Sequence, residues 1–132
     1  MPREPNVPPL TGLLETALYV ENLDRASRFY QLLFGFKEIS GGNRLRALSI
    51  GRKQVLLLFR KGGTEDTDAD GRIHLAFAVP ENALPAWERR LADLRIPIES
   101  RRKWELGGTS VYFRDPDNHL LELATPGVWS VY

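Results

Sequence analysis

The chain has 132 residues, which is enough for one folded domain with its own core but too few for two independent domains. With 42% hydrophobic residues, 27% charged residues and a net charge of +1, it has the composition of a soluble globular protein and lacks the basic excess of a nucleic-acid-binding protein. Because it contains no cysteine, disulfides, thiolate nucleophiles and thiolate-ligated metals are excluded. Any metal must therefore be held by histidine and carboxylate side chains.

The first residues, 1–12, are rich in proline and contain no apolar run of signal-peptide length. Nowhere in the sequence is there an apolar stretch long enough to span a bilayer. We therefore expect a single cytoplasmic domain over residues 1–132, with neither a membrane nor nucleic acid as a partner.

The first predicted module, residues 13–60, begins with an apolar strand over 13–20. Apolar residues at helical spacing follow, and Asn22 or Asp24 can cap the start of this helix while Gly35 ends it. Three short strand-like runs, separated at glycines, complete the module. The predicted order is β-α-β-β-β.

Residues 61–72 are polar and glycine-rich without periodicity, so we expect a linker or a lid that orders over a ligand. After it the same order repeats over residues 73–125, with a helix that Pro97 stops and a tail at 126–132. Strands are predicted in this second module at 73–79, 96–100, 109–114 and 119–123. The last two strands are joined by a DPDN turn, in which Asn118 can adopt a left-handed conformation.

This duplication predicts an α+β fold in which two βαβββ modules curl mixed sheets around a central cavity. Side-chain alternation places Glu15 beside small residues on one face of the first strand, and His74 at the same place in its repeat. The same parity puts Glu122 on the matching face of the final strand, while Leu57 fills the fourth equivalent position. One imidazole and two carboxylates suit a divalent ion that keeps positions for water or substrate and acts as a Lewis acid.

Each of these residues has a structural alternative. Glu15 could meet a basic side chain or face water, because a buried and unpaired carboxylate in an apolar strand costs several kcal/mol. His74 could be a hydrogen-bonded structural histidine, and Tyr112 could serve only in packing. Since His119 lies beside the predicted turn, we expect it to be a solvated surface residue.

Other candidates follow from the same alternation. The run Arg101, Arg102 and Lys103 either draws in an anionic substrate or forms a solvated strand edge. Trp87 and Leu91 lie at helical spacing and are most simply core residues. Alternation alone predicts that four apolar residues line the cavity: Val55, Leu57, Phe59 and Ala76.

Three stretches carry a family resemblance: ALYVENLDRASRFYQLLFGF, HLAFAV and VYFRDPDNHLLEL. They are similar to the opening strand and helix, the second metal strand and the YF.DPDGN..E signature of the vicinal oxygen chelate superfamily. That superfamily groups glyoxalase I, fosfomycin-resistance enzymes, extradiol dioxygenases and bleomycin-resistance proteins. The resemblance spans residues 13–125 and implies paired βαβββ modules, commonly a homodimer, and a divalent metal that chelates vicinal oxygens of a small-molecule substrate.

Carried over by position, the resemblance implies that Glu15, His74 and Glu122 are metal ligands and that Tyr112 hydrogen-bonds a substrate oxygen. The metal it implies is Fe, Mn, Zn, Ni or Co. Glu15 departs from the family pattern, which usually has His or Gln there, and Leu57 stands where glyoxalases commonly have a carboxylate. The extra histidine of extradiol dioxygenases has no counterpart in RRKWELGG.

These observations favour a divalent-metal-dependent enzyme, either a glyoxalase-like lyase or isomerase or a dioxygenase-like oxidoreductase, that chelates a small oxygenated molecule. In such an enzyme Glu15 is either a ligand or, off the metal, the catalytic base. Isomerisation, ring opening, epoxide opening and thiol addition all remain open. Two other classes also remain: a metal-free drug-binding protein of the bleomycin-resistance type, and a domain whose site is a relict.

Overall fold

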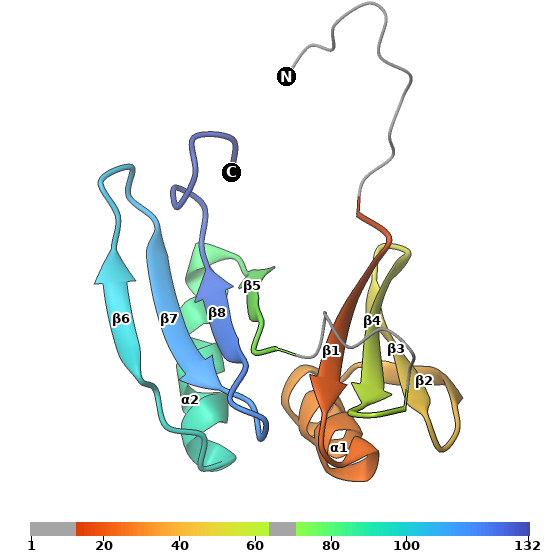
Figure 1. Cartoon of the computed structure of the whole chain (residues 1–132). Coiled ribbons are helices and arrows are strands. Elements are labelled where there is room, and N and C mark those ends of the chain that lie inside the picture. Colours follow the sequence, from red (N-terminus) through yellow and green to blue (C-terminus); the bar gives the residue numbers. More distant parts are fainter. Residues whose placement is uncertain (1–12, 64–70) are drawn as a thin grey trace, which may run out of the picture.

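Two four-stranded sheets lie side by side in the computed structural model, which describes residues 13–63 and 71–132 (Figure 1). The first sheet has the order β1-β4-β3-β2, with β1 parallel to β4 and the other pairs antiparallel. Its module contains β1 (Glu15–Val20), α1 (Leu23–Phe34), β2 (Lys37–Gly41), β3 (Leu45–Gly51) and β4 (Gln54–Arg60).

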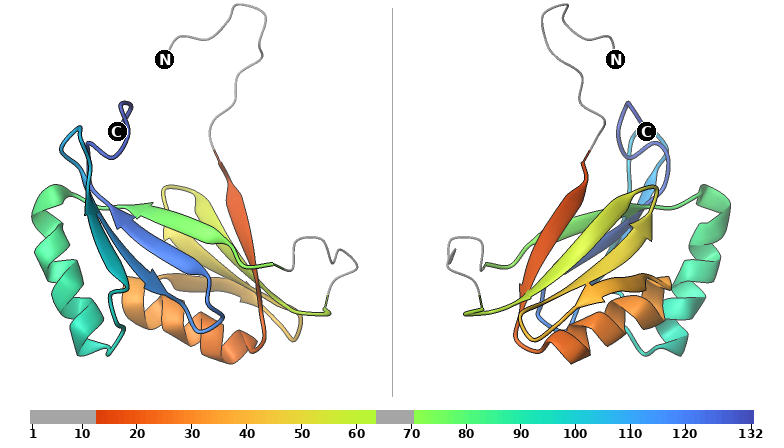
Figure 2. Two further views of the ribbon diagram at one scale, coloured as in Figure 1. Left: turned by 60° about the vertical axis from the view of Figure 1, so that its left-hand side comes forward. Right: turned by 90° about the vertical axis from the view of Figure 1, so that its right-hand side faces the viewer.

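The second sheet repeats this topology, with the order β5-β8-β7-β6 and β5 parallel to β8. Its module contains β5 (His74–Ala78), η1 (Glu81–Ala83), α2 (Leu84–Asp93), β6 (Ser100–Lys103), β7 (Thr109–Arg114) and β8 (Leu120–Ala124). The α+β fold and its duplicated β-α-β-β-β order are therefore confirmed. The two sheets remain separate and do not close into a barrel; α1 lies beneath the first and α2 flanks the second (Figure 2).

The predicted helix caps of the first module are present. The Asn22 side chain accepts a hydrogen bond from the Arg25 amide at 3.0 Å, so Asn22 rather than Asp24 is the N-cap. Gly35 closes the helix with φ of 73°, a conformation that glycine adopts without strain. Asp24 instead pairs with Arg46 at 2.6 Å. Neither helix in the described residues is long and apolar enough to cross a membrane.

One predicted strand is wrong in position. The segment 96–100 was expected to be a strand, but β6 begins only at Ser100. Pro97 has no amide hydrogen for a sheet ladder, and Ile96 and Ile98 pack against the core as an irregular segment. Of the other expectations, residues 64–70 of the proposed linker or lid, and the N-terminal segment 1–12, lie outside the described residues.

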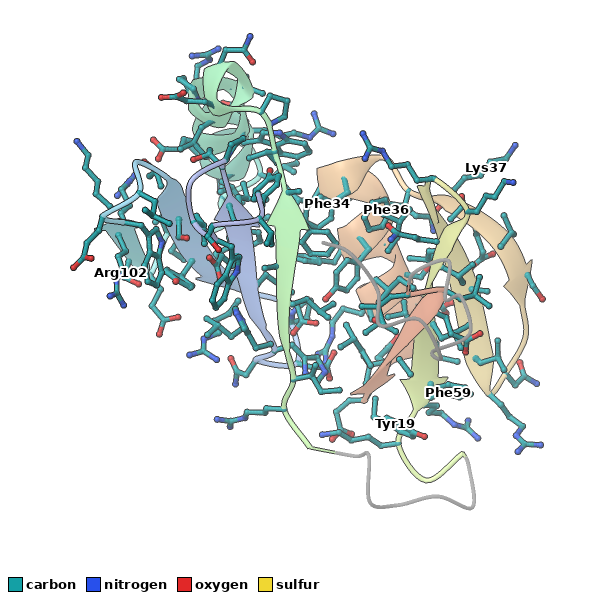
Figure 3. The ribbon with its side chains drawn as sticks, turned by 90° about the horizontal axis from the view of Figure 1, so that it is seen from above. Tyr19, Phe34, Phe36, Lys37, Phe59 and Arg102 are labelled. Carbon is teal, nitrogen blue, oxygen red and sulfur yellow. The ribbon has the colours of Figure 1, made fainter. Side chains whose placement is uncertain are left out.

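The modules meet through aromatic side chains. The rings of Phe34 and Phe77 are 4.5 Å apart between centroids, and the ring of Trp87 on α2 is 5.7 Å from that of Phe34. Figure 3 shows Phe34 and Phe36 between the two sheets. Trp87 is partly buried and Leu91 is fully buried, as expected for core residues.

The turn between β7 and β8 fastens the second module to the first. The Tyr30 hydroxyl on α1 donates to Asp115 at 2.8 Å, and the Glu21 amide donates to Asp117 at 2.9 Å. Asn118 takes the predicted left-handed conformation, with φ of 65°. The turn is therefore an inter-module contact as well as a strand connection.

The expectation that His119 is solvated is wrong, because this side chain is 1% exposed. Its Nδ1 accepts a hydrogen bond from the Ile73 amide at 2.9 Å. Nε2 therefore carries the ring proton, and it donates to the Tyr19 carbonyl 3.0 Å away. His119 thus links β8 to both β1 and the start of β5, a contact that no local pattern indicates.

Candidate metal centre

The second sheet has one face turned away from the core, and Glu122 lies at its centre. In the strand register Glu122 is paired with Ala76 of β5 on one side and with Tyr112 of β7 on the other. Its sequence neighbours Leu121 and Leu123 are fully buried on the opposite face. Alternation therefore places Glu122, as predicted, on the face that also carries the side chain of His74.

His74 and Glu122 are in contact. Their Nε2 and Oε1 atoms are 3.1 Å apart, and the histidine side chain is 50% exposed while that of the glutamate is 7% exposed. The other ring nitrogen, Nδ1, is 3.1 Å from the Leu120 carbonyl, which can only accept a hydrogen bond. Nδ1 therefore carries a proton, and Nε2 is the ring nitrogen that faces the Glu122 carboxylate.

The second carboxylate oxygen of Glu122 accepts a hydrogen bond from a neighbouring strand. The Ser110 hydroxyl donates to Oε2 at 2.5 Å, and the Trp104 indole N–H donates to that hydroxyl at 2.8 Å. Sequence reasoning missed both residues. Ser110 could have been found because it lies two residues before Tyr112 and so shares its face, whereas nothing in the sequence indicates Trp104.

Tyr112 lies beside the pair formed by His74 and Glu122. It is the cross-strand partner of Glu122, and its ring centroid is 6.4 Å from that of His74. Its side chain is half-buried.

Glu15 is not brought to the same place within one chain. It is the first residue of β1, is exposed, and lines a groove of about 900 Å³ whose lining includes neither His74 nor Glu122. Among the described residues no group of three or more His, Cys, Asp and Glu side chains could hold a metal ion. The single chain therefore assembles His74, Glu122 and Tyr112, and leaves Glu15 on the other sheet.

The equivalence of Leu57 and Glu122 follows from the register. Ala17 follows Glu15 by two residues, and its partner in the strand pairing is Leu57. In the same way, Ala76 follows His74 by two residues, and its partner is Glu122. Leu57 is half-buried and lies between two fully buried leucines of the opposite face. The first sheet thus carries an apolar side chain where the second carries the carboxylate.

The open face of the first sheet is apolar and aromatic. Val55, Leu57 and Phe59 alternate with buried residues of β4, as predicted. Tyr19 of β1 stacks on Phe59 with ring centroids 5.4 Å apart, and the two lie together in Figure 3. Ala76, the fourth predicted lining residue, is exposed on the second sheet.

The basic run on β6 is an exposed strand edge. Arg101 pairs with Glu88 at 3.1 Å, and Lys103 is exposed. Arg102 instead lies over the Trp104 ring, with its guanidinium carbon 3.7 Å from the ring centroid. Arg102 therefore contacts Trp104, the residue whose indole is hydrogen-bonded through Ser110 to Glu122.

Comparisons with known proteins agree with this architecture. The family model for the Glyoxalase/Bleomycin resistance protein/Dioxygenase superfamily matches residues 12–123. The chain is 30% identical to metallothiol transferase FosB of Shouchella clausii over 118 residues, covering 88% of this chain and 81% of FosB. It is also 30% identical to fosfomycin resistance protein FosX of Listeria innocua over 122 residues, covering 86% of this chain and 89% of FosX.

A similar solved structure is that of lactoylglutathione lyase from Agrobacterium tumefaciens. The TM-score is 0.84 at 30% sequence identity, and the superposition covers 93% of this chain and 99% of the lyase. The match extends through both modules and the strands that carry His74 and Glu122. By sequence and by fold, the chain belongs to the Glyoxalase/Bleomycin resistance protein/Dioxygenase superfamily.

Proposed function

We propose that this protein is a divalent-metal-dependent enzyme in which the metal binds two neighbouring oxygens of a small oxygenated molecule. The contact between His74 Nε2 and Glu122 Oε1, at 3.1 Å, carries this proposal. Because Nδ1 donates to the Leu120 carbonyl, Nε2 is the nitrogen that can bind a metal, and it faces a carboxylate oxygen that can bind the same ion. Atoms at this separation fit adjacent positions around an ion whose bonds are about 2.1 Å long.

The residues around the pair have roles suited to that chemistry. A divalent ion would polarise a bound oxygen and stabilise negative charge that develops on it. Tyr112 is proposed to donate a hydrogen bond to a substrate oxygen. A half-exposed His74 beside a buried Glu122 leaves one side of the site open to an incoming molecule.

We further propose that Glu15 reaches this site from a second copy of the chain. It occupies in β1 the position that His74 occupies in β5, yet it lies on the other sheet. The apolar side chains of Val55, Leu57 and Phe59 share the open face of that sheet and would gain from being covered. A homodimer that sets the first sheet of one copy against the second sheet of the other meets both requirements and supplies a second carboxylate.

The reaction class is proposed from the relatives. FosB is named a metallothiol transferase, and the structurally similar protein is named a lactoylglutathione lyase, so both names refer to thiol compounds. We propose that this enzyme joins a small oxygenated molecule to a thiol or separates the two. Within this proposal the metal is Fe, Mn, Zn, Ni or Co, Glu15 is a ligand or the base, and the protein works in the cytoplasm.

A metal titration tests the proposal. Protein purified without chelator should contain close to one equivalent of a divalent metal per chain, and after chelation it should rebind Mn²⁺, Ni²⁺ or Zn²⁺ by calorimetry. His74→Ala removes a ligand and Glu122→Gln removes the negative charge of another, so each should weaken binding at least about 100-fold. Glu81→Gln, an exposed carboxylate on η1, is the matched control and should bind as the wild type.

A metal-free binding protein is the second candidate, favoured by the stacked Tyr19 and Phe59 on an apolar sheet face. Under this alternative the purified protein holds under a tenth of an equivalent of metal, rebinds none, and still binds small aromatic molecules. That set of results would overturn the metalloenzyme proposal.

A further inference from the structure

We propose that Trp104 is a positioning residue that acts through Ser110 to fix which oxygen of Glu122 faces the metal. This inference rests on the metal site proposed above, and it adds a residue from the hairpin between β6 and β7. The Ser110 hydroxyl links the indole of Trp104 to the carboxylate of Glu122.

The direction of the hydrogen bonds is set by chemistry. An indole N–H can only donate, so the bond of 2.8 Å between Trp104 Nε1 and Ser110 Oγ makes the hydroxyl an acceptor. The hydroxyl hydrogen is then directed to Glu122 Oε2, 2.5 Å away. With Oε2 occupied, Oε1 is the oxygen left toward His74, at 3.1 Å.

Burial makes this arrangement difficult to replace with water. Ser110 is 0% exposed and Glu122 is 6% exposed. A carboxylate with little solvent around it depends on its protein donors, and a hydrogen bond to a charged group is stronger than one between neutral groups. Loss of the Ser110 hydroxyl would therefore free Glu122 to rotate rather than simply expose it to solvent.

Backbone contacts fix the hairpin that carries Trp104, and Arg102 covers the indole ring. The Trp104 amide donates to the Gly108 carbonyl at 2.8 Å, and the Gly107 amide donates to the Trp104 carbonyl at 3.0 Å. Gly108 packs so closely on the C-terminal segment that a Cβ there would collide with the backbone of Val128. Arg102 covers the ring at 3.7 Å, on the outer strand of the second sheet (Figure 3). The hairpin therefore presents the indole N–H at a defined point.

The expected effect is on metal affinity. Partners that orient a metal ligand typically change affinity about 10–100-fold, so Trp104→Phe and Ser110→Ala should each weaken Zn²⁺ binding by about that factor. If Trp104 acts only through Ser110, the double variant should be no weaker than Ser110→Ala alone. Trp129→Phe and Ser40→Ala, at exposed positions on the tail and on β2, are the matched controls and should bind as the wild type.

A spectroscopic measurement separates positioning from a merely structural role. In a ¹⁵N–¹H spectrum of the intact protein, the Trp104 indole resonance is assigned by its absence from Trp104→Phe. Addition of Zn²⁺ should shift this resonance in the wild type. The ion withdraws electron density from the Glu122 carboxylate, which changes the hydrogen bonds from Ser110 to Glu122 and from Trp104 to Ser110. In Ser110→Ala the resonance should no longer respond.

The outcomes distinguish this inference from the proposed function. If Zn²⁺ binds near one equivalent but the Trp104 resonance stays still, or Trp104→Phe binds Zn²⁺ as tightly as the wild type, the positioning role is overturned and the metal site stands. Absence of any Zn²⁺ binding by the wild type overturns the metal site and the positioning role with it. If Trp104→Phe fails to fold, the wild-type titration still decides the metal site, and Zn²⁺ affinity of Ser110→Ala tests the positioning role.

Discussion

The phenolic oxygen of Tyr30 lies 2.8 Å from Oδ2 of Asp115, and this buried hydrogen bond joins α1 of the first module to the β7–β8 turn of the second. Burial raises the pKa of Tyr30 well above its usual value, and the neighbouring carboxylate of Asp115 raises it further. Burial also raises the pKa of Asp115, against the opposing effect of its hydrogen bonds from the His119 amide and the Tyr30 hydroxyl. The Tyr30 hydroxyl and the Asp115 carboxylate are thus hydrogen-bond partners in a buried position.

Tyr30→Phe should lower the free energy of unfolding by about 2 kcal/mol, because it removes one donor to a buried carboxylate. Asp115→Asn should also destabilise the protein, and the double variant should cost less than the sum of the two single changes. Urea denaturation of the four proteins measures this coupling. Strict additivity would show that the bond does not contribute to stability.

The same pair gives a pH dependence with a defined sign. Tyr30 has a raised pKa in the folded protein, so above the usual tyrosine pKa of 10.0 the unfolded chain loses this proton while the folded protein keeps it. The stabilisation is complete below pH 10 and is lost as the pH rises toward the folded pKa, at up to about 1.4 kcal/mol per pH unit. The advantage of the wild type over Tyr30→Phe should be constant from about pH 6 to 9 and shrink above 10. An unchanged advantage at pH 11 would contradict the shift.

The two histidines of the chain should respond oppositely to replacement. His119→Ala removes a ring that bridges Ile73 and Tyr19, so it should destabilise the protein by about 2–4 kcal/mol. His74→Ala, at a half-exposed position, should change the free energy of unfolding by less than about 0.5 kcal/mol while abolishing metal binding. Thermal unfolding and calorimetric metal titration of each variant measure the contrast. A His119→Ala variant that stays folded should retain the metal, and loss of the metal from it would argue for a different ligand set.

Mixing variants tests whether Glu15 acts across a dimer. Glu15→Ala and His74→Ala should each bind no metal tightly alone, but unfolding and refolding them together should restore about a quarter of the wild-type capacity, since half the dimers are mixed and each has one complete site. His74→Ala mixed with Glu122→Gln is the control, because both lesions lie in one module and no complete site can form. Full metal binding by Glu15→Ala alone would exclude it as a required ligand and leave it as a candidate base.

Much of the fold could be predicted from the sequence because its signals are local. The caps Asn22 and Gly35, helical spacing and strand alternation all act over a few residues, and the duplication makes each module a check on the other. The strand at 96–100 failed because apolar residues around Pro97 resemble a strand while packing as an irregular segment. The pattern of apolar residues shows which side chains are buried, and buried side chains can also lie in an irregular segment.

The site was predictable only in part. Alternation identified the shared face of His74 and Glu122, and the signature identified Tyr112. The buried role of His119 and the contact of Trp104 with Ser110 were not predictable, since they depend on how separate elements pack. Glu15 shows the limit of a symmetry argument, because equivalent positions in two modules need not meet within one chain.

The most direct test of the metal centre is a crystal structure of the protein grown with Mn²⁺, with anomalous scattering recorded for the ion. We predict one anomalous peak per chain about 2.0–2.3 Å from His74 Nε2 and Glu122 Oε1, with the carboxylate of Glu15 of a second copy completing the set. A fully occupied Mn²⁺ elsewhere, or a space between His74 and Glu122 that stays empty at millimolar Mn²⁺, would contradict it.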